Sequence, residues 1–167
     1  MDLPETQRTV DERTTLTEML DYQRTVIVRK VSGLNKEQAL TRLEPSTLTL
    51  AGLLRHLIVV DIYWFIVVLQ GKEMPPSWAA ENWETDRDWE MTSAADFMPE
   101  EIIADFEKTW SEVAAISASM DLNHVGTRAD GTEISHRWVL VHLIEEYARH
   151  NGHADLIRES VDGSTGD

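Results

Sequence analysis

The chain has no cysteine, so it contains neither a disulfide framework nor a protein thiol that could act as a nucleophile. Any sulfur chemistry must therefore use a thiol supplied from outside. Basic residues are also scarce, because 15 lysines and arginines stand against 30 acidic residues, giving a net charge of −15. Nucleic acids and anionic membranes are recognised by basic surfaces, so this balance argues against both as partners. A plain gain in solubility explains the acidic charge equally well.

Long hydrophobic runs are missing as well. The longest, residues 57–69, contains Asp61 and is shorter than the roughly 20 residues that cross a bilayer, so we interpret it as a buried helix. The first five residues lack the basic region and apolar core of a secretory signal. These features predict a cytoplasmic protein. The length predicts one domain over residues 1–167, with a loose arm at 1–10 and a loose tail at 160–167.

Four segments have the apolar spacing of amphipathic helices. They cover about residues 11–31, 46–69, 99–120 and 135–158. Helix-capping side chains open the second segment, Gly33 and Gly71 end the first two, and Pro99 suits the first position of the third. Since we find no convincing strand and no internal repeat, the pattern predicts an all-α protein, specifically a four-helix bundle.

A long connection joins the second and third predicted helices. Residues 71–98 lose the helical period and contain Trp78, Trp83 and Trp89 among acidic residues. Three indoles favour an ordered segment over a disordered one. Two interpretations remain open: the tryptophans cover the side of the bundle, or they line the entrance to a substrate site.

Histidines and glutamates crowd the predicted fourth helix. Glu146 and His150 are four residues apart and therefore share a face, with His142 a turn before them and His153 nearly a turn after. A carboxylate and an imidazole at this spacing supply two ligands to a divalent metal, but at least one more must come from elsewhere. His56 in the second helix can supply it if the two helices are neighbours.

A hydrogen-bonded polar cluster without metal is the main alternative to this metal site. Apolar residues interleave with the cluster, so we expect part of it to lie against the core, where an unpartnered carboxylate is costly. These apolar residues, expected on the core side, are Val141, Ile144, Tyr147 and Leu156.

Residues 137–159, taken with residues 54–57 and 63–65, resemble the DinB-like family. The similarity is to an actinobacterial branch that resembles the metal-binding domain of mycothiol-dependent maleylpyruvate isomerase. The resemblance implies a four-helix bundle that holds a divalent metal, usually zinc. It assigns the ligands to His56, Glu146 and His150, with glutamate first in the fourth-helix pair as in that branch.

The resemblance also implies a chemistry. Three protein ligands leave one position of a zinc ion open, and a small thiol there would be deprotonated. We therefore expect a metal-dependent thiol S-transferase that uses mycothiol as cosubstrate and attacks a small electrophile, as in detoxification. Maleylpyruvate isomerase carries a further C-terminal domain that these 167 residues do not include, so we expect transfer rather than maleylpyruvate isomerisation.

Two other functions use the same residues. One is a zinc-dependent hydrolase, in which the ion activates water. The other is a non-catalytic helical-bundle protein of the same family, and a homodimer is left open in either case. Arg149, His153 and Trp64 are candidates for binding the thiol cosubstrate, with surface ion pairs and core packing as the ordinary alternatives.

Overall fold

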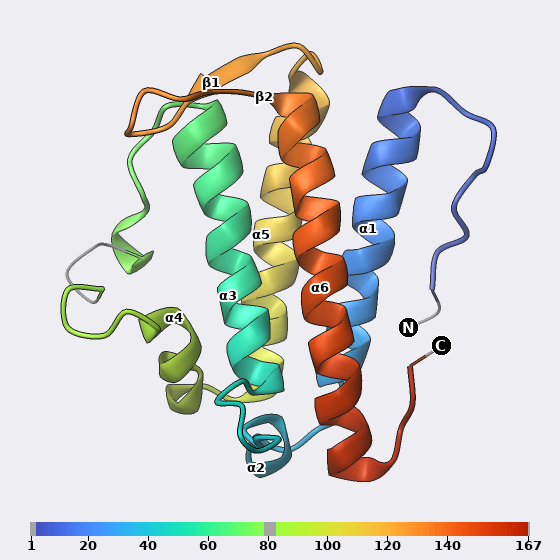
Figure 1. Ribbon diagram of the computed structural model, residues 1–167, viewed down its shortest axis with the longest axis vertical. Coiled ribbons are helices and arrows are strands. Elements are labelled where there is room, and N and C mark those ends of the chain that lie inside the picture. The colour runs from blue at the N-terminus through green and yellow to red at the C-terminus, as the bar shows by residue number, and fades with distance from the viewer. Residues whose placement is uncertain (1–2, 79–82, 167) are drawn as a thin grey trace.

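The computed structural model describes residues 3–78 and 83–166 and is mostly helical, as predicted. Four long helical segments lie side by side (Figure 1). They are α1 (Glu12–Val31), α3 (Leu50–Ile62) with its π-helical continuation η1 (Tyr63–Leu69), α5 (Pro99–Ser119) and α6 (His136–Asp162). The shorter elements are α2 (Lys36–Ala39), η2 (Pro76–Trp78), α4 (Trp89–Thr92), η4 (Ser93–Asp96), β1 (Val125–Thr127) and β2 (Glu133–Ser135).

Side-chain caps set where three of the long helices begin. Asp11 accepts a hydrogen bond from the backbone of α1, Thr49 from that of α3, and Ser135 from that of α6. The chain leaves α1 and η1 close to Gly33 and Gly71, where both glycines have positive φ. The predicted helices are therefore present, with boundaries that shift by a few residues.

α3 and η1 form the centre of the core. Its buried residues include Leu50, Leu53, Leu54, Leu57 and Trp64. Within the described part of the chain, Leu50–Leu69 is the one helix long and apolar enough to cross a membrane. However, 78% of its apolar window is buried inside the molecule, as in the core helix of a globular fold.

A buried hydrogen-bond network joins all four long helices. Asp61 on α3 accepts from Arg24 Nη2 on α1 at 2.8 Å and from the Tyr147 hydroxyl on α6 at 3.0 Å. Arg24 also contacts Asp21, which accepts from Trp110 Nε1 on α5 at 2.9 Å. Burial would lower the pKa of Arg24, but the Asp61 carboxylate raises it, so the guanidinium stays charged. The acidic residue of the longest apolar run is thus paired inside the core.

The segment between α5 and α6 contains a small sheet, so the prediction of no strand was wrong. β1 and β2 pair antiparallel, with Gly126 opposite Ile134. A Cβ built on Gly126 would lie 2.2 Å from the Val68 carbonyl oxygen, so the hairpin packs directly on η1 only because this residue is glycine. Strands of three residues show too little alternation to be recognised in a sequence.

Two apolar residues of α6 lie on the solvent side, contrary to expectation. Val141 is 51% exposed and Leu156 is 58% exposed, whereas Tyr147 is fully buried and Ile144 is partly buried. The buried face of α6 follows a different helical stripe, which includes Leu140, Leu143, Tyr147, His150, Ala154 and Ile157. Val141 and Leu156 fall outside this stripe, so the helix turns them away from the core.

The tryptophan-rich connection is ordered over its described residues, as expected; residues 79–82 lie outside them. Trp89 at the start of α4 meets Trp78 and Trp83 edge-to-face, with ring centroids 5.8 and 5.9 Å apart. The Arg55 guanidinium of α3 lies 4.6 Å from the centroid of the Trp78 ring. These contacts support the interpretation that the connection covers the side of α3.

Candidate metal centre

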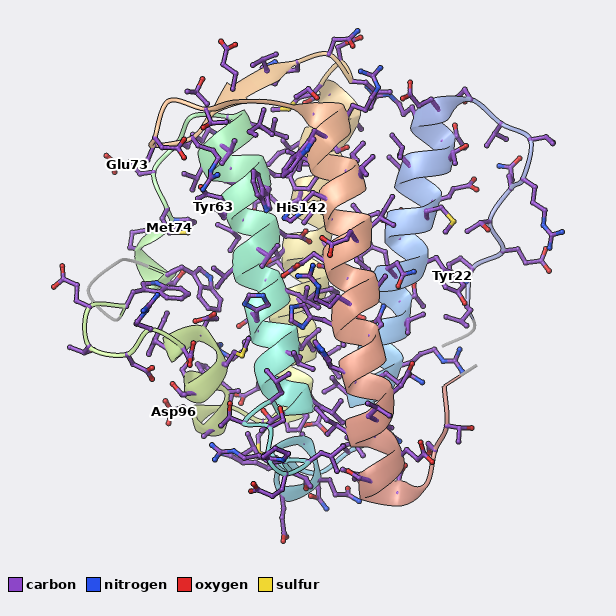
Figure 2. All side chains as sticks on the ribbon, in the orientation of Figure 1. Tyr22, Tyr63, Glu73, Met74, Asp96 and His142 are labelled. Atoms are coloured by element: carbon purple, nitrogen blue, oxygen red, sulfur yellow. The ribbon has the colours of Figure 1, made fainter. Side chains whose placement is uncertain are left out.

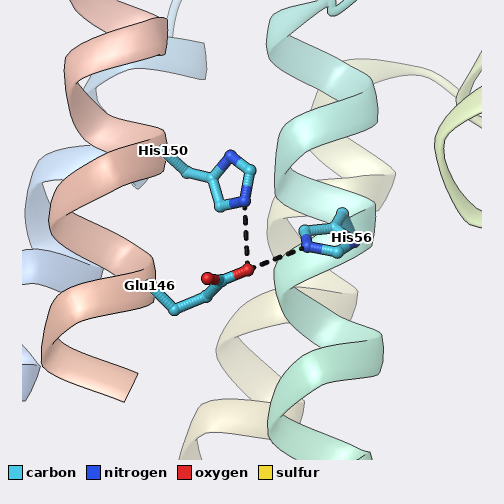
Figure 3. Close-up of side chains that lie close together, drawn as sticks. All are labelled: His56, Glu146 and His150. Carbon is cyan, nitrogen blue, oxygen red and sulfur yellow. Dashed lines mark hydrogen bonds and ion pairs between the residues drawn. The ribbon is translucent and has the colours of Figure 1, made fainter. Parts of the chain in front are cut away.

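His56 on α3 and the pair Glu146 and His150 on α6 meet where the two helices adjoin (Figure 3). Glu146 Oε1 lies 3.3 Å from His56 Nε2 and 3.2 Å from His150 Nε2. One possible ligand atom from each residue lies within 4.8 Å of the other two. The three residues selected from the sequence are therefore brought together by the fold.

The cluster lies at the edge of the core. The side chains of His56, Glu146 and His150 are 20%, 13% and 10% exposed. Such partial burial strengthens electrostatic interactions, because little water screens them. It still leaves part of each side chain in contact with solvent.

The charges of the three groups depend on one another. Burial would raise the pKa of Glu146, but its hydrogen bond with His56 and the nearby His150 lower that pKa, so the carboxylate is ionised at neutral pH. Burial and then the neighbouring His56 lower the pKa of His150, which favours its neutral form. Burial opposes protonation of His56, yet hydrogen bonds to Glu90 and Glu146 outweigh it and raise the pKa.

Two more residues of α6 contact the cluster. Arg149 Nη1 donates to Glu146 Oε2 at 3.1 Å, which leaves Oε1 facing the imidazoles, and Arg149 also pairs with Glu145. His153 Nδ1 lies 3.4 Å from His150 Nδ1. Arg149 and His153 therefore lie beside Glu146 and His150, as the helical spacing predicted, and each contacts one of these two residues.

Glu90 was missed in the sequence. It lies on α4, and its Oε1 is 3.2 Å from His56 Nδ1, across 34 residues of chain. No helical spacing links residues so far apart, because the contact depends on how the connection folds back onto α3. The only feature of the sequence that could have indicated Glu90 is its position directly after Trp89, in a segment expected to be ordered.

An aromatic cluster of Trp64, Trp138 and His142 adjoins these residues. The His142 ring stacks on Trp138 with centroids 4.9 Å apart and meets Trp64 edge-to-face at 5.1 Å. Trp138 is 45% exposed, whereas Trp64 is buried. Figure 2 shows His142 on α6 and Tyr63 at the start of η1, the continuation of α3. His142 lies one helical turn before Glu146, so the aromatic cluster continues the α3–α6 face toward the hairpin.

The donor set suits a divalent cation. Two imidazole nitrogens and one carboxylate oxygen form a combination that binds zinc and other divalent transition metals. Ligand bonds of about 2.0–2.1 Å in a tetrahedral site place neighbouring donors about 3.3 Å apart. The separations from Glu146 Oε1 of 3.2 and 3.3 Å match that spacing.

The fold and the cluster together define a class: a helical protein with a candidate His–Glu–His metal centre between two of its helices. Residues 15–163 match the sequence model of a family described as Mycothiol-S-transferase. The chain therefore belongs to the mycothiol S-transferase family, which is a DinB-like family, and the resemblance is confirmed. The matched region includes all three residues of the cluster. No curated protein matches the sequence.

Proposed function

We propose that the protein is a metal-dependent thiol S-transferase, built on a DinB-like four-helix bundle, that joins the sulfur of mycothiol to a small electrophile. The family supports the transferase class and the thiol. The single observation that carries the metal is one carboxylate oxygen, Glu146 Oε1, within 3.3 Å of imidazole nitrogens from two different helices. The absence of cysteine is consistent with a thiol supplied from outside.

In this proposal His56 and His150 bind the ion through Nε2, and Glu146 binds it through Oε1. Zinc is the expected ion because of the nitrogen and oxygen donors. When bound, a divalent ion would supply a positive charge that favours the thiolate form of a small thiol at neutral pH. The reaction breaks the thiol S–H bond and forms a sulfur–carbon bond, and the proton goes to solvent. With an aryl chloride as the electrophile the carbon–chlorine bond breaks and chloride leaves, so nothing is oxidised or reduced.

We also propose that Arg149, His153 and Trp64 contribute to the binding of mycothiol. The side chain of Arg149 is 56% exposed, so its guanidinium can meet a polar group of the thiol while it orients Glu146. His153 lies beside His150, and Trp64 contributes to the aromatic cluster next to Glu146. Arg149 and His153 each contact one of the proposed ligands, and Trp64 contacts His142, which lies one helical turn before Glu146.

The proposal is tested by following conjugation of 1-chloro-2,4-dinitrobenzene in the presence and absence of mycothiol. We expect a thiol-dependent rate that is lost after chelation and restored by zinc. Glu146→Gln should lack this rate, while Glu159→Gln, an exposed position on the same helix, should retain it. Turnover of an ester without added thiol would favour the hydrolase instead. Absence of both activities and of bound metal would favour a non-catalytic protein.

A further inference from the structure

Glu90 is a buried carboxylate beside the proposed metal centre. It is 6% exposed, and Oε1 lies 3.2 Å from His56 Nδ1. Its other oxygen, Oε2, is buried and has no hydrogen-bond partner among the residues that the structure describes. Burying an ionised carboxylate with an unpartnered oxygen is costly, so the side chain needs a strongly polarised partner. The imidazole of His56 is the partner that the geometry provides.

We propose that Glu90 is a positioning residue that holds the His56 imidazole in the orientation needed to bind a metal. The Nδ1–H group donates to Glu90 Oε1, which leaves Nε2, the nitrogen that faces Glu146, as the one that can give up its proton and bind a metal. This inference rests on the proposed function, because it assigns an orienting residue to the same metal centre. Carboxylates that accept from the second nitrogen of a ligand histidine fix its tautomer and raise its basicity.

The close packing of α4 on α3 brings Glu90 to His56. Gly52 lies one helical turn before His56, and a Cβ built on it would lie 3.2 Å from the backbone oxygen of Met91. It would also lie 2.9 Å from Thr49 Oγ1, which caps α3. A side chain at this position would therefore push away the backbone next to Glu90.

Contacts on both sides of Glu90 hold the segment in place. Trp89 packs against Trp78 and Trp83. Ser93 Oγ, one turn further along, accepts from Arg55 Nε at 3.1 Å. Arg55 and His56, which are adjacent on α3, thus both contact this segment, but only the contact between His56 and Glu90 involves the proposed metal centre. Ser93 therefore offers a matched control.

The test measures zinc affinity by competition with a chromophoric chelator, so it does not depend on enzymatic activity. Glu90→Met keeps the volume and removes the acceptor, and we expect about a 10- to 100-fold loss of affinity. Glu90→Gln keeps an acceptor oxygen and should lose much less. Ser93→Ala breaks the bond to Arg55 and should bind zinc as the wild type does. Thermal melts of all the variants establish that each is folded.

A double-mutant cycle separates positioning from a general structural effect. In a His56→Ala background, Glu90→Met should cause no further loss of zinc affinity. If Glu90→Met caused the same loss of zinc affinity in the His56→Ala background as in the wild type, Glu90 would not act through His56. Wild-type zinc affinity in the single Glu90→Met variant would also overturn the positioning role of Glu90. If the wild-type chain binds no divalent metal, the proposed metal centre itself is overturned. Zinc binding that ignores Glu90 overturns only the present inference.

Discussion

The Tyr147 hydroxyl donates a 3.0 Å hydrogen bond to Asp61, and so links α6 to α3 close to the proposed metal centre. Tyr147 directly follows Glu146, and Asp61 lies five residues after His56 on α3. Because successive side chains of a helix point about 100° apart, anchoring Tyr147 in the core turns Glu146 toward the edge where His56 lies. The hydrogen bond between Tyr147 and Asp61 therefore helps to fix the rotation of α6 about its own axis relative to α3.

Asp61→Ala should strongly destabilise the protein. The substitution leaves the Arg24 guanidinium buried without its carboxylate, and breaking such a pair typically costs about 3–5 kcal/mol. Urea unfolding should show this loss in the free energy of unfolding. Asp130→Ala removes an exposed carboxylate from the hairpin loop and should change stability by less than about 0.5 kcal/mol. Equal stability of the two variants would contradict the structural role of the network.

Two glycine substitutions should have opposite effects. Gly126→Ala places a Cβ against the Val68 backbone, so we expect a loss of about 1–3 kcal/mol as the hairpin moves off η1. Gly152 lies within α6 with open space around its Cβ position, so Gly152→Ala should add about 0.5–1 kcal/mol. Thermal unfolding of both variants beside the wild type checks the two signs, and a stable Gly126→Ala variant would argue against the close approach.

Chelation should lower the melting temperature of the wild type. A ligand that binds only the folded state adds about 2.7 kcal/mol when present at 100 times its dissociation constant. His150→Ala removes a proposed ligand, so its melting temperature should barely respond to zinc or to chelator. His124→Ala provides the control, because His124 Nε2 contacts the Leu69 carbonyl and not the metal centre. A zinc response of His150→Ala equal to that of the wild type would refute this assignment.

His136 should make stability fall as the pH drops below neutrality. Burial lowers the pKa of this histidine, and the nearby Arg13 and His124 add to the effect, while its nitrogens contact Ser117 Oγ and the Asp121 carbonyl. The unfolded chain binds a proton near its usual pKa of about 6.5, whereas the folded chain resists it. The free energy of unfolding is therefore not reduced by His136 above about pH 6.5. It falls as the pH drops below this value, because protonation of His136 then favours the unfolded chain.

The variant His136→Gln isolates this effect. Its free energy of unfolding, measured in chelator between pH 5 and 7, should depend less on pH than that of the wild type. Chelator keeps metal binding from contributing to the comparison. Identical pH dependence of the two proteins would show that His136 does not titrate differently on folding.

Local spacing explains which parts of the protein could be predicted from the sequence. The long helices and the pairing of Glu146 with His150 follow from periodicity and caps within one segment. His56 required an assumption about which helices are neighbours, and the family resemblance supplied it. Val141 and Leu156 were misassigned because apolar character does not reveal which side of α6 faces the core.

Contacts between distant segments were not predictable in the same way. Glu90 reaches His56 only because Gly52 lets the α4 backbone approach α3. The hairpin likewise depends on the contact of Gly126 with η1, which no periodic pattern encodes. In both cases a glycine allows two backbone segments to approach closely, but the sequence does not show which segment packs against the glycine.

The edge-to-face packing of Trp89 with Trp78 and Trp83 gives the protein a built-in optical reporter. Indole fluorescence responds to the surroundings of the ring, and Trp89 directly precedes Glu90. Displacement of α4 from α3 would expose these rings to water and shift their emission to longer wavelength. Titrating zinc while recording the difference in emission between the wild type and a Trp89→Phe variant would follow the segment without a label.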